Sequence, residues 1–383
     1  MFLSLISGVR GGGRDRERDD DRDQQRERDD EDGRRTGAEP SLYDAALNGH
    51  TDVVKRLLAK GADPNIADRG TTPCYVAAAR GHADVVKALL AAGADPNKAD
   101  YGKTPCWVAA FRGHANVVKA LLASDRTDPN IADDDGITPC LKAAEYNHVD
   151  VMKVLLNDRR TDPNIADDDR RTPIGVAARK GYAEVMNLLL ANKRTNPNIL
   201  DADEATPCHI ASQKGHTDVV MALLTAGADP NKANRYGTTP CYIAARNGHE
   251  GVVKLLLDAG ADPDVANEDR YTPCFTAAEN GHAGVVEQLL AKGADPNIEN
   301  EYGKTPIGAA AQRGHVDVVK VLLADRRTDP NKASKFRKTP CSAAVIEFNM
   351  LRRRSILSAA NEARRERYGE VIEILRKHGA KCD

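Results

Sequence analysis

TPCYVAAARGHADVVKALLAAGADPN, residues Thr72–Asn97, returns in altered form every 32 to 34 residues over most of the chain. Thr72 is a favourable helix N-cap, and Pro73 suits the first helical position, where its missing N–H costs nothing. A short helix is expected there, ended by Gly81. A second helix follows, and Gly93 is placed to end it in the left-handed conformation. The stretch therefore predicts a pair of short helices.

Each helix of the pair carries an apolar stripe. On the first helix the small residues Cys74, Ala77 and Ala78 recur at helical spacing, which lets a neighbouring helix approach closely. Helices this short cannot bury their apolar faces alone, so the pair requires copies of itself on both sides, as in a solenoid. The second helix carries the larger residues Val85, Val86, Leu89 and Leu90.

The repeated unit resembles the ankyrin repeat. TPCYVAA corresponds to the family signature T-P-L-H-x-A, and GHADVVKALL and GADPN follow it. The sequence departs from the signature in placing Cys, or Ile174 and Ile307, where the family has Leu, and His follows only at His209. The resemblance covers residues 41–383. It implies an all-α repeat solenoid whose helix-turn-helix units are joined by β-hairpin-like loops.

Ten units are expected, with polar caps at both ends. Thr-Pro pairs begin nine of them, and the first unit begins at Ser41 without that pair. The last unit, residues 339–383, contains 19 inserted residues that we expect to prolong its first helix, and Arg376 there replaces an apolar residue. Residues 1–40 form a mixed-charge tract with nothing apolar to bury beyond its first few residues, so we expect a disordered tail.

The composition excludes several classes of partner. A net charge of −2 with 29% charged residues gives no excess that would attract nucleic acid or an anionic membrane. No apolar run approaches the roughly 20 residues of a transmembrane helix, so membrane insertion is not expected. The apolar stretch MFLSLISGV at the start contains no basic n-region of the kind that begins a signal peptide, which argues against a signal peptide here.

Seven of the eight cysteines occupy the same position in successive units. Stacked helices lie roughly 8–10 Å apart, whereas the Cα atoms of a disulfide are at most about 7 Å apart. We therefore expect free core thiols, which argue for the cytoplasm or the nucleus. These cysteines are Cys74, Cys106, Cys140, Cys208, Cys241, Cys274 and Cys341.

Several motifs look like reactive or modified sites but are better explained by the repeat. Cys recurs at one position of the repeat and His at another, so the two residue types do not converge in the ligand pairs that a zinc site requires. The loop DPNIADDDG, counted from Asp128, has Ala132 where a calcium ligand belongs and Asp133 where Gly is required. Each Thr-Pro threonine is needed as an N-cap rather than as a phosphorylation site. Ser355, after three arginines in the insertion, is the one phosphorylation candidate, although a solvated helix face explains it better.

The family resemblance implies that the histidine of each Gly-His pair caps the turn between the two helices. No nucleophile triad, phosphate loop or isolated carboxylate pair was found, so no enzyme activity, cofactor or small-molecule substrate is predicted. The capping role is assigned to His50, His82, His114, His216, His249, His282 and His315, with Tyr182 and Tyr368 as substitutes.

Binding is expected at the hairpin tips and at the exposed ends of the first helices, because these positions have no packing role and line the concave side. Aromatic and arginine side chains, which dominate interface energetics, recur there. Trp107, Tyr75, Tyr242 and Phe275 are instead expected to pack between units. The candidate partner-binding residues are Arg69, Tyr101, Lys103, Phe111, Arg112, Asp134, Asp135, Glu145, Tyr146, Arg171, Arg179, Arg235, Tyr236, Arg246, Glu268, Tyr271, Tyr302 and Lys304.

The leading hypothesis is a non-catalytic, monomeric scaffold or adaptor that binds one or more partner proteins. Two alternatives stay open. The array could be the regulatory or targeting portion of a larger enzyme, for example one associated with a kinase or a ubiquitin ligase. It could also be an RNA-associated factor that uses its Arg-rich tail, although nucleic-acid binding is disfavoured by the tail's negative net charge. The sequence does not identify the partner.

Overall fold

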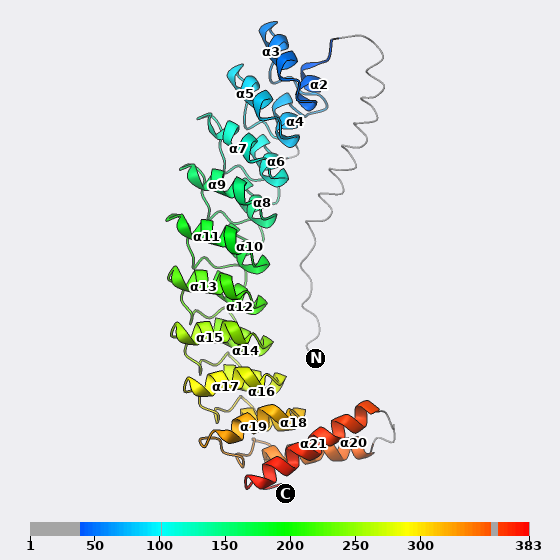
Figure 1. The fold of residues 1–383 in the computed structure, drawn as a ribbon, viewed down its shortest axis with the longest axis vertical. Helices are drawn as coiled ribbons and strands as arrows, with labels where there is room; N and C mark the ends of the chain where they lie inside the picture. The colour runs from blue at the N-terminus through cyan, green and yellow to red at the C-terminus, as the bar shows by residue number, and fades with distance from the viewer. Residues whose placement is uncertain (1–38, 101, 354–358, 383) are drawn as a thin grey trace.

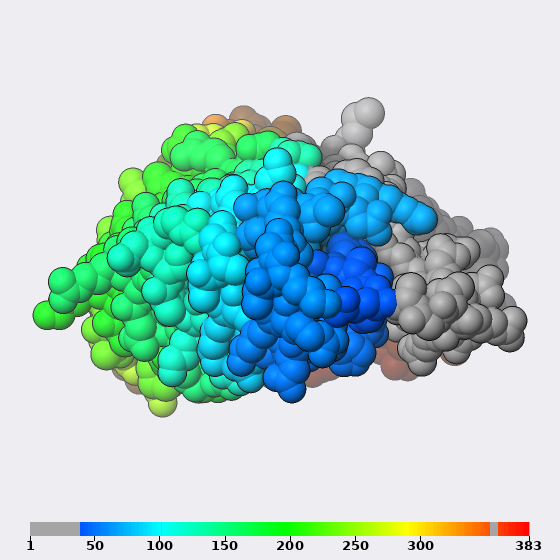
Figure 2. Space-filling view, turned by 90° about the horizontal axis from the view of Figure 1, so that it is seen from above, coloured from blue at the N-terminus to red at the C-terminus, as the bar shows by residue number. Residues whose placement is uncertain are grey.

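A computed structural model describes residues 39–100, 102–353 and 359–382. These residues form helices in pairs, and the ten pairs stack in series into an elongated solenoid (Figure 1). The solenoid is bowed, so in the view from above the green middle units extend to one side of the blue first units (Figure 2). The first helices line the concave side of the bow and the second helices the convex side (Figure 1). The first helices are α2 (Leu42–Leu47), α4 (Pro73–Ala79), α6 (Pro105–Arg112), α8 (Pro139–Glu145), α10 (Pro173–Lys180), α12 (Pro207–Lys214), α14 (Pro240–Asn247), α16 (Pro273–Asn280), α18 (Pro306–Arg313) and α20 (Pro340–Arg353). The second helices are α3 (Thr51–Ala59), α5 (Ala83–Ala91), α7 (Ala115–Leu122), α9 (Val149–Asn157), α11 (Ala183–Ala191), α13 (Thr217–Thr225), α15 (Glu250–Asp258), α17 (Ala283–Ala291), α19 (Val316–Ala324) and α21 (Ala359–Lys377).

Threonine N-caps start the first helices, as predicted. In α4 the hydroxyl of Thr72 accepts a hydrogen bond from the backbone N–H of Tyr75 at 3.2 Å. A cap of this kind stabilises a helix by about 1 kcal/mol. Ser41 makes a capping box with Asp44 in the first unit. The same bond recurs at Thr104, Thr138, Thr172, Thr206, Thr239, Thr272, Thr305 and Thr339.

The small-residue stripe of the first helices forms the interior, as predicted. Cys74, Ala77 and Ala78 are at most 1% exposed, and their equivalents in the other units are buried too, except for the half-buried Val345 in the last unit. The larger residues of the second helices, such as Val86 and Leu89, close the core from the convex side. Trp107 and Phe275 are fully buried, which confirms that their position packs between units.

The second helices end in one of two ways. In α5, Gly93 has φ +96° and the N–H of Ala94 donates to the carbonyl of Leu89 at 2.9 Å, a Schellman-type end. Units with Arg-Thr in place of Gly-Ala use side chains instead. The Thr127 hydroxyl donates to the carbonyl of Leu121 at 2.6 Å and so closes its own helix, α7.

Arginines of the same loops close the helix of the preceding unit. The guanidinium of Arg160 donates to the carbonyls of Leu122, Ser124 and Thr127 at 2.7–3.1 Å, and Asp158 holds it in place at 2.6 Å. A positive charge at the C-terminal end of a helix also complements the helix dipole.

Asparagine side chains link successive loops along the array. The side-chain amide of Asn130 donates to the carbonyl of Arg160 at 2.7 Å, and its oxygen accepts from the N–H of Asp162 at 2.8 Å. Asn97, Asn164 and Asn297 make equivalent pairs of bonds. The turn chemistry of Asp-Pro-Asn therefore also fixes the spacing between units.

The insertion in the last unit prolongs both of its helices, whereas we predicted a longer first helix only. α20 has 14 residues and α21 has 19, against nine or fewer in each earlier helix. An antiparallel pair can lengthen only if both members grow, because each supplies the apolar contacts of the other. The long pair projects from the end of the array on its concave side (Figure 1).

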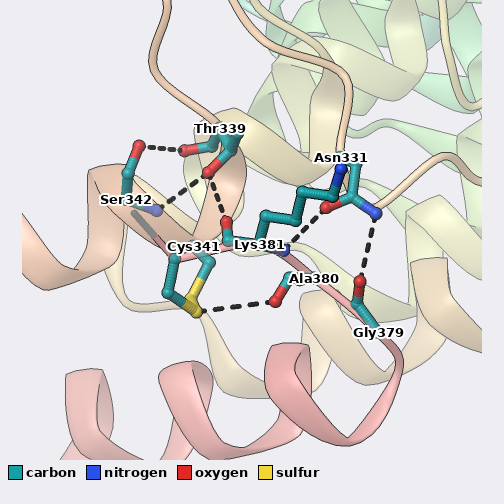
Figure 3. The surroundings of a disulfide bond; sticks show 8 residues. Asn331, Thr339, Cys341, Ser342, Gly379, Ala380 and Lys381 are labelled. Atoms are coloured by element: carbon teal, nitrogen blue, oxygen red, sulfur yellow. Dashed lines mark hydrogen bonds between the residues drawn. A yellow bond between two sulfur atoms is a disulfide. The ribbon is translucent and has the colours of Figure 1, made fainter.

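Cys341 is not a free thiol, which corrects the prediction for this residue. It forms a disulfide with Cys382, with Cα atoms 4.8 Å apart (Figure 3). The spacing of stacked helices does prevent disulfides between equivalent cysteines of successive units, and the other six cysteines are free and buried. Cys382 reaches Cys341 from outside the column, on the segment that follows α21. That segment is also held by Asn331, which accepts from the N–H of Lys381 at 2.7 Å.

Candidate functional site

The Gly-His pairs set the spacing of the concave side, but by a different contact from the one predicted. None of these histidines makes a side-chain capping bond to its own helix. Instead, Nε2 of His148 lies 2.9 Å from the carbonyl oxygen of Phe111 in the preceding unit. The hydroxyl of Tyr368 donates to Gln312 at 2.9 Å in the same way, and His148 itself was left out of the predicted set. Equivalent bonds are made by His82, His114, His216, His249, His282 and His315.

The glycine of each pair makes room for the histidine of the next unit. A Cβ atom on Gly113 would lie 2.8 Å from Nδ1 of His148, closer than any side chain tolerates, and φ is +79° there. The unit that has Asn147 in place of this glycine precedes the unit that has Tyr182 in place of the histidine. Gly and His are thus partners across units rather than within one.

Backbone hydrogen bonds join many of the hairpin tips into a ridge along one edge of the concave side. The N–H of Arg235 donates to the carbonyl of Asp203 at 3.1 Å, which links tips one unit apart. Side chains on this ridge are therefore held at a fixed spacing. Equivalent bonds run from Asp168 to Asp135, from Glu268 to Tyr236, from Glu301 to Asp269 and from Lys335 to Tyr302.

The predicted binding residues differ in their exposure. Tyr101 and Ser355 lie outside the described residues. The exposed ones are Arg69, Asp134, Asp135, Arg179, Arg235, Tyr236, Arg246, Glu268 and Tyr302. Those that are half-buried are Lys103, Arg112, Glu145, Tyr146, Arg171, Tyr271 and Lys304.

Phe111 was predicted to be a surface contact, and this is wrong. Its side chain is 3% exposed, because the ring packs between Trp107 at 5.5 Å and Tyr146 at 5.0 Å, measured between ring centroids. The Tyr146 ring meets it edge-on, an arrangement that stabilises aromatic pairs beyond their buried area. Phe111 therefore supports the concave surface from below.

Lys142 completes this group and was missed by the sequence analysis. Its side chain is 2% exposed, and Nζ lies 5.3 Å from the Trp107 ring, 5.7 Å from Phe111 and 5.4 Å from Tyr146. A cation among three aromatic rings gains cation–π attraction. We call Trp107, Phe111, Lys142 and Tyr146 the α8 cluster. The signal was present in the sequence, because most equivalent positions hold aliphatic residues such as Val108, and no other unit has a basic residue there.

Charged side chains of both signs surround the α8 cluster. Glu145 pairs with Lys142 at 3.0 Å and lies 3.9 Å from Arg171, which in turn pairs with the buried Asp167 at 2.6 Å. Arg112 lies over the Phe111 ring at 5.4 Å. Tyrosine and arginine side chains, such as Tyr146 and Arg112 here, are enriched at the centres of protein interfaces.

The surroundings of Asp133, in the hairpin tip that precedes α8, shift the pKa of its carboxyl. Burial raises the pKa of its carboxyl, although the N–H groups of Ile137 and Asp135 donate to it at 2.8 and 3.2 Å. These bonds shape the hairpin tip that carries Asp134 and Asp135. The carboxyl therefore orders the loop rather than facing a ligand.

Residues 42–133, 125–201, 177–267 and 260–334 match the family described as ankyrin repeats (3 copies). The chain belongs to the ankyrin repeat family. No curated protein sequence matches it. Ankyrin repeats are generally protein–protein interaction modules, and the helical repeat fold is typically non-catalytic. The matched range includes the α8 cluster and most of the hairpin tips.

The cysteines of the ankyrin units are unsuited to act as nucleophiles. Burial raises the pKa of each free thiol to about 12, so the reactive thiolate is absent at neutral pH. Among the described residues, no three His, Cys, Asp or Glu side chains converge where they could hold a metal. Within the same part of the chain, no helix is both long and apolar enough to cross a bilayer.

Proposed function

We propose that this ankyrin repeat protein is a non-catalytic scaffold or adaptor that grips a partner protein along its concave side and hairpin tips. The α8 cluster and the charged side chains around it carry this proposal. Half-buried Tyr146 and Arg112 there are anchored by fully buried rings, so a partner would meet side chains that lose little entropy on binding.

The exposed tips on either side extend this surface. Asp135 lies in the tip before α8, whereas Arg179 and Arg246 lie at the ends of α10 and α14. The sign of the charge therefore changes along the concave side. A partner with the complementary order of charges would be selected, since like charges brought together weaken binding.

A charge-reversal variant tests the proposal. D135K, R179E and R246E together alter three exposed residues of the concave side. The matched control K119E, K254E and E287K makes the same net change on exposed residues of the second helices. Each protein is used as bait, captured proteins are identified by mass spectrometry, and circular dichroism checks the fold.

Proteins captured by the wild type should be lost with the concave variant and retained with the control. If both variants capture the same proteins as the wild type, the concave side is not the binding surface. Phe111→Ala is not a suitable test, because the buried ring would report on stability rather than on contact.

Of the disordered tail predicted at residues 1–40, residues 1–38 lie outside the described residues, so their disorder stays a prediction. The monomeric state also stays a prediction, which light scattering on the purified chain would check. Six free thiols support a reducing compartment, the cytoplasm or the nucleus, whereas the Cys341–Cys382 bond gives no support to that assignment.

A further inference from the structure

Positive charge is concentrated at one end of the chain. Residues 313–383 contain seventeen Lys and Arg but nine Asp and Glu, although the whole chain has 55 and 57. The preceding residues are therefore acidic overall. Long-range attraction for a negatively charged partner is confined to the last units of the array.

Exposed apolar side chains gather at the same end. Phe336, on the last hairpin tip, is 69% exposed, more than any other large apolar residue of the described chain. Lys335, Arg337 and Lys338 surround it in sequence and are exposed. An exposed apolar patch rimmed by polar residues marks an interaction site when further apolar side chains extend it.

The first helix of the last unit adds to this surface. Ile346 and Met350 on α20 are 38% and 44% exposed and lie one turn apart, on one face of the helix. In earlier units, the helix pair of the next unit covers the face of the first helix that corresponds to this face of α20. The projecting part of α20 has no such cover from the described residues (Figure 1).

A pocket of about 320 Å³ lies between α20 and α21. Gly369 leaves its α21 side open, because a Cβ atom added there would meet only the Phe348 ring, at 3.9 Å. The volume exceeds that of one Leu or Phe side chain, at the lower end of the range for ligand sites. It is lined by Val345, Phe348, Asn349, Gly369, Ile372 and Arg376.

Basic side chains lie before and beyond the pocket. The tip 334–338 leads into α20, and the exposed Arg364, Arg365 and Arg367 precede the pocket residues on α21. Since α20 and α21 run antiparallel, these two groups lie toward opposite ends of the pair. Arg376 itself lines the pocket.

We propose that α20, α21 and the tip 334–338, together the end surface, dock an acidic segment of a partner protein whose apolar side chain enters the pocket between the two helices. Carboxylates of the segment would meet the arginines and lysines on either side. The charge complementarity and the apolar side chains of Val345, Phe348 and Ile372 in the pocket select this occupant.

An RNA strand fits the end surface less well. Glu362 and Glu366 alternate with the arginines of α21, so a phosphate backbone, which is charged at every nucleotide, would meet charges of both signs, whereas a peptide can place its acids opposite the arginines alone. Val345, Phe348 and Ile372 give the pocket an apolar part of its wall that suits a peptide side chain better than the polar edge of a base, and Asn349 and Arg376 form the polar part. The acidic hairpin tips of a second copy of this chain are another occupant that the test separates.

The experiment measures fluorescence anisotropy of a labelled probe peptide with the full chain. In the probe, Glu and Asp surround one Leu and one Phe. Two control peptides replace the apolar pair by Ser or the acids by Lys. The wild type should bind the probe with an affinity that falls as salt rises, and should bind both controls at least about tenfold more weakly.

Gly369→Leu fills the pocket and should weaken probe binding by about tenfold or more, whereas Gly369→Ala should leave it unchanged. K335E with R337E and K338E should weaken it without touching the pocket, which keeps the test valid should Gly369→Leu unfold. Equal affinity of the wild type and both variants for the probe would overturn the proposal.

The other occupants give different results. Binding of a single-stranded oligouridine but not of the probe would overturn the proposal in favour of RNA. Salt-sensitive dimers that the probe does not dissociate would do so in favour of a second copy. The concave variant D135K/R179E/R246E should bind the probe like the wild type, so failure here is distinguishable from failure of the proposed function.

Discussion

Nζ of Lys142 lies 3.0 Å from Oε2 of Glu145, one turn further along α8, and the lysine side chain is 2% exposed. A lysine this deeply buried keeps its charge only if a partner compensates for the lost water. Glu145, at 17% exposed, still reaches the surface. The pair thus connects the interior of the array to its concave face.

Glu145→Gln should leave the buried lysine without a charged partner and lower the free energy of unfolding by about 3 kcal/mol. Lys142→Ile should cost little, because other units place Val108 and Ile210 at this position. Urea denaturation followed by circular dichroism gives both values. An equal loss of unfolding free energy in the two variants would contradict this prediction, because it would mean that the aliphatic part of the Lys142 side chain contributes as much as its charge.

Reduction of Cys341–Cys382 should loosen the last unit alone. The bond closes a separation of 41 residues, and opening such a loop costs about 2–4 kcal/mol. Hydrogen exchange with and without dithiothreitol should show faster exchange in α20 and α21 and no change in earlier units. Cys382→Ser should exchange at the faster rate throughout and ignore the reductant. Unchanged protection of the wild type on reduction would contradict the prediction.

Stability should fall with acid because of His209. Burial lowers the pKa of this imidazole from 6.5 to about 4, and Nε2 contacts the Thr238 hydroxyl at 3.0 Å. Above pH 6.5 the residue is neutral in both states and its contribution is complete. As pH falls toward 4 the unfolded chain binds the proton first, so stability is lost, by on the order of 3 kcal/mol in full.

The control for this effect is His209→Phe, since Phe275 occupies the same position in a later unit. The variant should show a shallower decline in melting temperature between pH 7 and pH 4.5. Some decline should remain, because burial also lowers the pKa of His114 and His315. The same slope in both proteins would rule out His209 as the cause.

Arg160→Met should weaken the junction between its own unit and the preceding one. Three carbonyls at the end of α7 and in the loop that follows would lose their donor, at a cost of about 1–3 kcal/mol. The neighbouring Arg159 is exposed, so Arg159→Met is a matched control that should change stability little. A comparable loss in both variants, measured by thermal denaturation, would show that the carbonyl bonds contribute nothing specific.

The sequence predicted those features that one unit contains and missed those that need two. Thr72 and Gly93 act within their own helix pair, and their roles were predicted correctly. The partner of Gly113 is His148, 35 residues away, so no single unit shows why glycine is needed. Lys142 was visible only as the one basic residue at a position that is aliphatic in most units.

The end of the chain was least predictable for the same reason. Comparison between units predicts where a cysteine lies from the equivalent residues of other units, and Cys382 has no equivalent. The inserted residues likewise lack a template in the repeat, so their helical composition favoured a longer helix without fixing which one. Binding positions on the tips could be predicted as positions, whereas their exposure depended on packing such as that of Phe111.

The Cys341–Cys382 bond makes the two ends of the array unequal, so unfolding should begin at the end that lacks it. A stack held only by contacts between neighbours unravels from whichever end is weaker. At one end α3 buries Val54 alone, whereas at the other α21 buries four residues and its following segment is covalently tied to α20. A protease or an unfolding motor would therefore strip units beginning with α2 and α3, and the end surface would be the last part to be lost.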